Sequence, residues 1–172
     1  MKIALIAPSP VPFTVGGAEN LFWGLQNYIN ESTQHQCELI KIPSPESNLE
    51  QLISSYQHFS NLNLNHFDAV VSTKYPSWMV NHDNHICYLL HRLRGLYDTY
   101  HFTGHPIEVP WDIREMQAAE KLSLELTQLG DNNLNASFSL CRQFLKEHAD
   151  SKVIEFPGPF ARWLIHHFDS KK

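Results

Sequence analysis

The first residues of the chain constrain its fold more than any later segment does. Lys2 to Ala7 form a compact apolar run that leads into a loop containing Pro8, Pro10 and Pro12. A short run of this kind is typical of a strand that is buried on both faces. Apolar residues then recur at helical spacing, at positions 18, 21, 22, 25, 28 and 29. We therefore expect a central strand, a glycine-containing loop and a helix that lies on a sheet.

The same alternation continues through the first half of the chain. Apolar positions between Leu49 and Phe59 predict a second amphipathic helix, and further strands are expected at Cys37–Ile42, Ala69–Thr73 and Ile86–His91. Parallel neighbours need long crossover connections, and helices between strands supply them. The sequence therefore predicts an α/β fold with a Rossmann-like parallel sheet and flanking helices.

The second half has a different pattern. Apolar spacing predicts helices over 116–129 and 134–145, joined by a turn at Gly130–Asn133, and this indicates a helical hairpin. A short fifth strand is expected at Val153–Phe156, and a last helix over 160–168. With 172 residues the chain is long enough for a self-sufficient core, so residues 1–172 are expected to form a single domain.

Charge and cysteine usage exclude several classes of protein. The chain has 13 Lys and Arg against 18 Asp and Glu, a net charge of −5 without a basic block, so nucleic-acid binding is not expected. Three widely spaced cysteines, Cys37, Cys87 and Cys141, indicate neither a disulfide framework nor a zinc ribbon and favour a reducing, cytoplasmic compartment. The proline-broken amino-terminal run is too short for a signal peptide, and no transmembrane segment is expected.

The first candidate motif is VGGAE, residues 15–19, which follows the first strand and its loop. Gly16 and Gly17 at a helix start allow backbone N–H groups to approach an anion, which the helix dipole also favours. This predicts a site for a phosphate or diphosphate. The alternative is structural: the glycines permit a tight turn, and Glu19 complements the dipole.

Two further motifs lie at the carboxyl ends of expected strands, where open parallel sheets bind ligands. In TKYPSW, residues 73–78, Lys74, Tyr75 and Trp78 predict a charged and aromatic wall for a sugar ring, although Pro76 and Trp78 could equally fill the core. In HRLRGLYDTYH, residues 91–101, arginines can clamp phosphate or carboxylate and a histidine can transfer a proton. The structural alternative here is an ion pair between Arg94 and Asp98.

Taken in order, these motifs resemble the amino-terminal region of family 4 glycosyltransferases, retaining enzymes with two facing Rossmann-like domains (the GT-B architecture). The resemblance spans roughly residues 1–105, and PGPFARWLIHHFD at 157–169 extends it. It implies that Gly16 and Gly17 lie near the diphosphate of a nucleotide-sugar donor and that His91 lies by the transferred sugar as the catalytic residue. It also implies an acceptor pocket shared by seven residues: Lys74, Tyr75, Trp78, Arg92, Arg94, Tyr97 and Asp98.

The resemblance further implies transfer to a sugar or glycolipid acceptor in cell-surface polysaccharide or glycolipid synthesis, with no cofactor besides the nucleotide-sugar co-substrate and no metal. Such enzymes hold the nucleotide in a carboxyl-terminal domain, for which these residues leave no room. This chain is therefore expected to be inactive alone, to work in the cytoplasm or at the inner membrane face, and to show an exposed apolar patch or self-association as a homo-oligomer.

Two alternatives come from other classes of protein. A stand-alone α/β module could bind a sugar or phosphate without chemistry. A metal-dependent hydrolase would use the eleven histidines, of which His82 with His85 and His101 with His105 have ligand-like spacing. These pairs lie in expected loops without an H-E-x-x-H motif, so no metal site is predicted.

Overall fold

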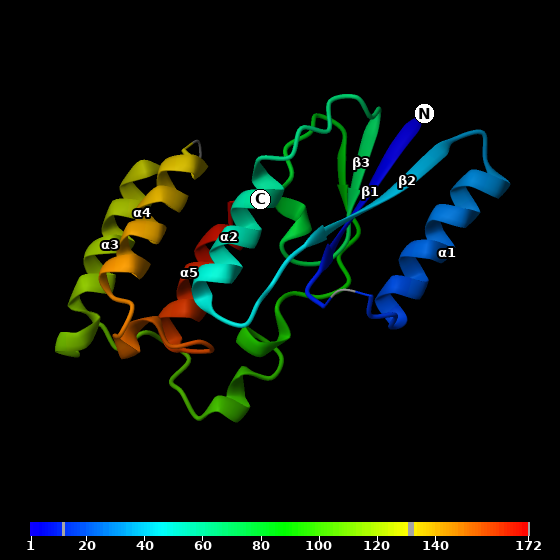
Figure 1. Ribbon diagram of the computed structural model, residues 1–172. Coiled ribbons are helices and arrows are strands. Elements are labelled where there is room, and N and C mark those ends of the chain that lie inside the picture. Colours follow the sequence, from blue (N-terminus) through cyan, green and yellow to red (C-terminus); the bar gives the residue numbers. More distant parts are fainter. Residues whose placement is uncertain (12, 131–132, 172) are drawn as a thin grey trace. The chain divides into compact units, whose positions relative to one another are not determined.

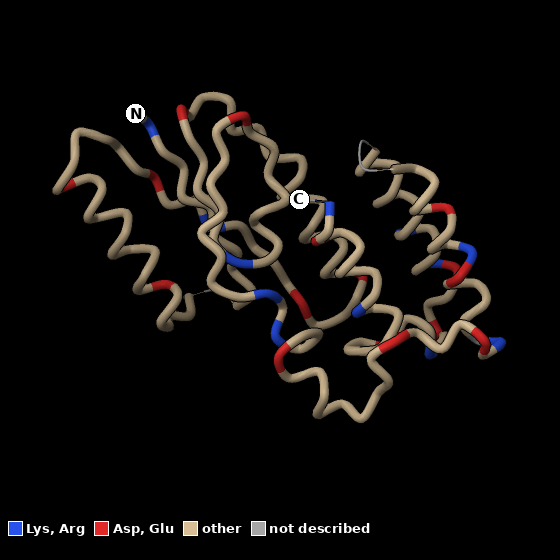
Figure 2. The backbone as a smooth tube through the Cα atoms, turned by 180° about the vertical axis from the view of Figure 1, so that it is seen from behind, with Lys and Arg blue, Asp and Glu red and all other residues tan. Residues whose placement is uncertain are grey.

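A computed structural model describes residues 1–11, 13–130 and 133–171. The chain divides into two compact units (Figure 1). Unit 1 comprises Met1–Pro45 and Ser55–Arg92, and unit 2 comprises Glu46–Ser54 and Leu93–Lys172. Helix α2 (Leu49–Ser60) contributes residues to both. Basic and acidic residues are interspersed along the backbone without a long stretch of one sign (Figure 2).

Unit 1 contains a four-stranded, all-parallel sheet, which confirms the predicted α/β, Rossmann-like class. The strands are β1 (Lys2–Ser9), β2 (Gln36–Pro43), β3 (Ala69–Ser72) and β4 (His85–Cys87), in the order β2-β1-β3-β4. Strand β1 pairs with both β2 and β3, so it is an inner strand as expected. The order reverses between β1 and β3, where the chain has crossed from one side of β1 to the other.

Strand β4 is shorter than the expected strand at 86–91. Regular pairing ends at Cys87, although the N–H groups of Tyr88 and Leu90 still donate to the carbonyls of Ser72 and Thr73 at 2.8 and 3.0 Å. The chain therefore stays beside the end of β3 without keeping strand geometry. The apolar side chains at 86, 88 and 89 are exposed, so this run adds little to the core.

Helix α1 (Gly17–Ser32) covers one face of the sheet. Phe22 is buried against Leu5, Ala7 and Cys37, with the partly buried Leu39 beside them. Alternate residues of a strand share a face, so odd-numbered positions of β1 and β2 face this helix. Strand β1 is doubly buried as the sequence predicts. Of the predicted stripe, Ala18, Phe22, Leu25 and Ile29 pack into this core, whereas Leu21 and Tyr28 are exposed.

Unit 2 contains the helical hairpin. Helix α3 (Gln117–Leu129) packs against α4 (Leu134–Glu147), whose first turn is capped by Asn133 accepting from the N–H of Ala136. Helix α5 (Pro159–Asp169) completes the core, where the rings of Phe138 and Phe168 stack at 4.7 Å. The expected turn at 130–133 includes residues 131 and 132, which lie outside the described part of the chain.

The fifth strand expected at Val153–Phe156 is wrong. Lys152–Ile154 form a 3₁₀ turn, in which Ser151 accepts from the N–H of Val153 and Glu155 donates to the carbonyl of Lys152. The N–H groups of this segment are used in local hydrogen bonds, and Pro157, which has no N–H, comes soon after. The segment is therefore too short, and has too few available donors, to pair as a strand. Other 3₁₀ turns lie at Ser77–Met79, Arg94–Leu96, Tyr100–Thr103 and Arg114–Met116. None of the helices in the described residues combines the length and hydropathy that a membrane span requires.

Candidate functional site

A groove of about 450 Å³ opens in unit 1 at the carboxyl ends of β1 and β2. The loop between β1 and α1 forms one wall, and α1 and β2 form the others; the lining residues are Ser9, Phe13, Thr14, Val15, Trp23, Lys41 and Pro43. This edge is where open parallel sheets bind ligands. The groove therefore lies beside the predicted glycine turn, but of the predicted motifs only Val15 lines it.

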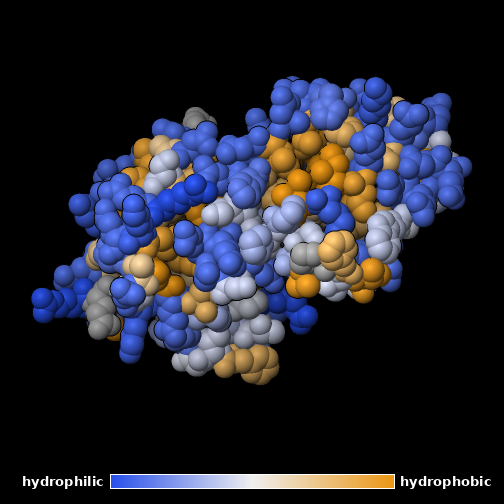
Figure 3. Space-filling view, in the orientation of Figure 1, coloured by the Kyte–Doolittle hydropathy of each residue, from blue (hydrophilic) through white to orange (hydrophobic). Residues whose placement is uncertain are grey.

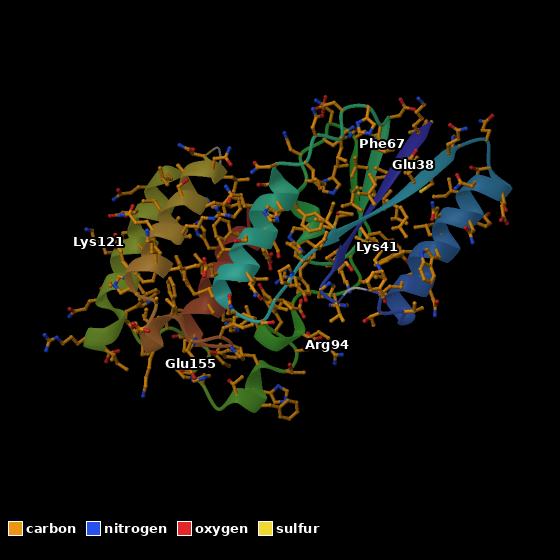
Figure 4. The ribbon with its side chains drawn as sticks, in the orientation of Figure 1. Glu38, Lys41, Phe67, Arg94, Lys121 and Glu155 are labelled. Carbon is orange, nitrogen blue, oxygen red and sulfur yellow. The ribbon has the colours of Figure 1, made fainter. Side chains whose placement is uncertain are left out.

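The strand register places Lys41 in this groove. Cys37, Leu39 and Lys41 alternate along the face of β2 that α1 covers, and Lys41 lies opposite Ala7 of β1. Figure 4 labels Lys41 on β2. Cys37 and Leu39 pack under α1, and Lys41 follows them toward the carboxyl end of β2, where the groove opens. An ammonium group there supplies positive charge to a wall that is otherwise aromatic and hydroxyl-bearing.

The loop that leads into α1 exposes several apolar side chains, which gather there in the space-filling view (Figure 3). Phe13 is 99% exposed, and Val11, Val15 and Trp23 are exposed as well. Phe13 also has φ = 61°, in the left-handed region that residues with a side chain rarely adopt. The exposed phenyl ring makes no core contacts that would offset this backbone strain. Strained residues of this kind are common at ligand sites.

The glycine turn forms the start of α1 as predicted, with Gly16 as the N-cap and Gly17 as the first helical residue. The N–H of Gly16 donates to Oε2 of Glu19 at 3.0 Å. Glu19 thus complements the helix start, as the structural alternative expected. An added Cβ at Gly17 would meet no atom within 4 Å, so the backbone of this first turn stays approachable. A phosphate at Gly16 would compete with the Glu19 carboxylate.

The TKYPSW loop is interior to unit 1. Lys74, Tyr75 and Trp78 are only 8%, 5% and 7% exposed. The hydroxyl of Ser77 holds the loop closed, since it accepts from the N–H of Thr73 at 2.9 Å and donates to the carbonyl of Lys74 at 2.7 Å. Burial of this degree supports the packing role that the sequence left open for Trp78.

His91 lies beside this loop. Its ring centroid is 6.0 Å from that of Tyr75, and its Nδ1 is 2.8 Å from the carbonyl oxygen of Arg92. Because a carbonyl oxygen only accepts, Nδ1 carries the hydrogen and Nε2 of the neutral ring is left as the acceptor. Nε2 is therefore the atom of His91 suited to receive a hydroxyl hydrogen.

The remaining candidates belong to two units. Arg92 is an exposed residue of unit 1, whereas Arg94, Tyr97 and Asp98 belong to unit 2. Arg94 and Asp98 form the expected ion pair at 3.6 Å, with both side chains more than half exposed (Figure 4 labels Arg94). The hydroxyl of Tyr97 donates to Asp169 at 2.9 Å. Within the units, the structure brings together Tyr75 with His91 and Arg94 with Asp98.

Several histidines have partners of their own. His82 Nε2 lies 3.1 Å from the carbonyl oxygen of Phe67, and His85 Nε2 lies 2.8 Å from the hydroxyl of Ser72. His105 faces Glu155 at 3.8 Å. Across residues 1–11, 13–130 and 133–171, no three His, Cys, Asp or Glu side chains gather as a metal site would require.

Burial limits the thiol reactivity of two of the three cysteines. Cys87 is exposed, while Cys37 and Cys141 are buried and unbridged. Loss of hydration raises the pKa of the Cys37 thiol, and it raises the pKa of the Cys141 thiol to about 12. Both buried thiols are therefore protonated and unreactive at neutral pH.

Sequence reasoning missed Phe13, Trp23 and Lys41. Trp23 is not among the helically spaced apolar positions that define the buried stripe, and a large apolar residue off that stripe was the available signal. Lys41 lies inside an expected strand, so it did not stand out as a site residue. The available signal was a lysine on an otherwise apolar strand face, which indicates the point where the helix no longer covers that face. Comparisons with protein-family models, curated proteins and solved structures found no significant match.

Proposed function

We propose that this chain is the acceptor-side domain of a retaining, nucleotide-sugar-dependent glycosyltransferase. The observation that carries the proposal is the groove in unit 1, which combines exposed aromatic rings with a lysine at the carboxyl edge of a parallel sheet. Aromatic faces accommodate the apolar faces of sugar rings, and a few polar groups fix orientation. The sequence resemblance supplies the reaction class.

In this proposal the acceptor sugar lies between Phe13 and Trp23. Hydroxyls of Ser9 and Thr14 hydrogen-bond to it, and the Lys41 ammonium donates to a hydroxyl or to an anionic group of a glycolipid. The acceptor pocket is thereby assigned to these side chains, and the more buried Lys74, Tyr75 and Trp78 support the sheet edge from inside.

Donor chemistry is proposed for the two remaining motifs. Backbone N–H groups at Gly17 and the rest of the first turn of α1 would face the donor diphosphate, and oriented donors of this kind stabilise charge developing on a leaving group. The partner atom for the transferred sugar would be Nε2 of His91. In the family that the chain resembles, a second Rossmann-like domain holds the nucleotide, so turnover is assigned to the two domains together.

The proposal is tested by calorimetric titration of the full chain with methyl α-glucoside, N-acetylglucosamine, UDP-glucose and GDP-mannose. We expect binding of at least one free sugar, no turnover, and about tenfold weaker binding after Trp23→Ala. The matched control is Tyr28→Ala, which removes another exposed aromatic of α1 that does not line the groove.

Four results would contradict the proposal. Unchanged affinity in Trp23→Ala would remove the groove from the site. Turnover by the chain alone would contradict the need for a second domain and leave a complete enzyme. Zinc retained in stoichiometric amount after chelation would favour the hydrolase. Sugar binding that persists when a donor domain is supplied, without transfer, would favour the stand-alone binding module.

A further inference from the structure

Unit 2 contains a second pocket, of about 260 Å³, that the proposed function does not use. It lies between α5 and the segment that precedes Trp111; its lining residues include Glu108, Trp111, Arg162, Trp163 and His166. This volume is slightly below the range of about 300–1,000 Å³ of drug-sized ligand sites, so it suits a ligand of monosaccharide size.

Two indole rings form a fixed corner of this pocket. Trp111 and Trp163 meet at 85° with their centroids 5.7 Å apart. Trp163 is held from within α5, because the nearly parallel rings of Phe160 and His167 lie 5.9 and 5.5 Å from it. The corner is therefore formed before a ligand arrives, which lowers the ordering cost of binding.

Arg162 also lines this pocket and is held in place by hydrogen bonds. Its Nε donates to the carbonyl of Leu96 at 3.1 Å and its Nη1 to the carbonyl of Ile107 at 3.1 Å. Its guanidinium carbon also lies 5.4 Å from the ring centroid of Tyr100. A guanidinium has five N–H donors, and these two bonds use two of them, so its plane is held in place while it keeps donor capacity.

The charges around the pocket select the class of ligand. Arg162 and Glu108 carry opposite charges, so together they give the pocket no net charge that would favour a cation or an anion. A neutral ligand with many hydroxyl groups can accept from Arg162, donate to Glu108 and exchange either with His166. It also has apolar faces that fit against indole rings.

We propose that this pocket binds a neutral pyranose, such as one residue of a polysaccharide or glycolipid. The inference stands on unit 2 alone and does not depend on the groove in unit 1. The site holds the ring by contact with the indoles and its hydroxyls by Glu108 and Arg162. It gives unit 2 a carbohydrate site of its own.

The test is ¹⁹F NMR of the full chain labelled with 5-fluorotryptophan. Its four tryptophans report separately: Trp111 and Trp163 on this pocket, Trp23 on the groove, and the buried Trp78 as an internal control. Glucose, galactose, mannose and N-acetylglucosamine are titrated, and glucosamine and glucuronate test the charge argument on the same ring.

We expect at least one neutral sugar to shift the Trp111 and Trp163 signals, and the charged sugars to bind more weakly. Glu108→Gln keeps the shape of the pocket and should weaken binding about tenfold, as should Trp111→Ala. If no neutral sugar shifts either signal, or if glucosamine or glucuronate binds best, the inference is overturned. A shift confined to Trp23 would also overturn it and leave the proposed function standing, whereas shifts confined to Trp111 and Trp163 would do the reverse.

Discussion

Replacing Gly158 with alanine should destabilise unit 2 through the space that a single methyl group needs. Gly158 is the buried N-cap of α5, with φ = −147° and ψ = 172°, an extended conformation that any residue adopts. A Cβ there would lie 2.6 Å from the carbonyl oxygen of Glu155 and 3.3 Å from its carbon. Both are backbone atoms, so no side-chain rotation relieves the contact.

The expected loss is that of overpacking a closed site, about 1–3 kcal/mol in the free energy of unfolding. For a chain of this size that corresponds to a fall of several degrees in Tm, at about 2–4 °C per kcal/mol. Urea unfolding followed by circular dichroism measures the free energy. Amide exchange in α5 should show that the loss is in unit 2.

Two comparison variants separate the causes. Gly24→Ala in α1 places its methyl in open space and should stabilise by up to about 1 kcal/mol, because glycine is a poor helix residue. Gly158→Ser restores a good N-cap but keeps the Cβ, so it should be destabilised like Gly158→Ala if space is the cause. Full recovery with serine would show that capping, not crowding, explains the loss, and an alanine variant as stable as the parent would refute the argument.

Three further outcomes are expected from burial and backbone geometry. A disulfide reagent at neutral pH should modify Cys87 in the native protein, while Cys37 and Cys141 react only after unfolding; modification of all three at one rate would contradict their burial. Burial raises the pKa of Cys141 from 9.0 to about 12, so the unfolded chain loses this proton first. The contribution of this thiol to the free energy of unfolding is therefore fully present below about pH 9. It falls by about 1.4 kcal/mol per pH unit as the pH rises from 9.0 toward about 12. Urea titrations at stepped pH should show this slope in the parent and a smaller one in Cys141→Ala. Phe13→Gly relieves the left-handed backbone, so it should stabilise by up to about 1 kcal/mol yet weaken sugar binding in the groove; stability and binding that fall together would indicate a packing role.

The strands and helices that pack on their own apolar pattern could be predicted from the sequence. Strand β1 is buried on both faces, and four of the six predicted stripe positions of α1 pack beside it, because hydrophobic periodicity largely decides these elements locally. At 153–156 the same signal failed. This short, mostly apolar segment forms a 3₁₀ turn and satisfies its backbone hydrogen bonds locally. A short run does not reveal whether a neighbouring strand is present to pair with it.

Position at the sheet edge could also be predicted, but side-chain exposure could not. Lys74 and Tyr75 follow β3 as expected, yet the hydroxyl of Ser77 folds their loop inward and buries them. Lys41 lies in the groove because of its place in the β1–β2 register. The burial of Lys74 and Tyr75 depends on side-chain hydrogen bonds, and the place of Lys41 depends on strand pairing. The hydrophobic periodicity of the sequence predicts neither.

The hydrogen bonds of α5 affect the order in which unit 2 folds. Arg162 bonds to a carbonyl 66 positions earlier, and Asp169 accepts from Tyr97, 72 positions earlier. Helices α3 and α4 are neighbours in sequence and can pair after closing only a short loop, and α5 reaches α4 over short separations too, through Phe160 with Phe144 and Phe168 with Phe138. Only the hydrogen bonds of α5 to Leu96 and Tyr97 must close loops of 66 and 72 residues. We therefore expect a non-local folding step in unit 2: α3, α4 and α5 come together first, and the segment of Leu96 and Tyr97 closes onto α5 in a slower event.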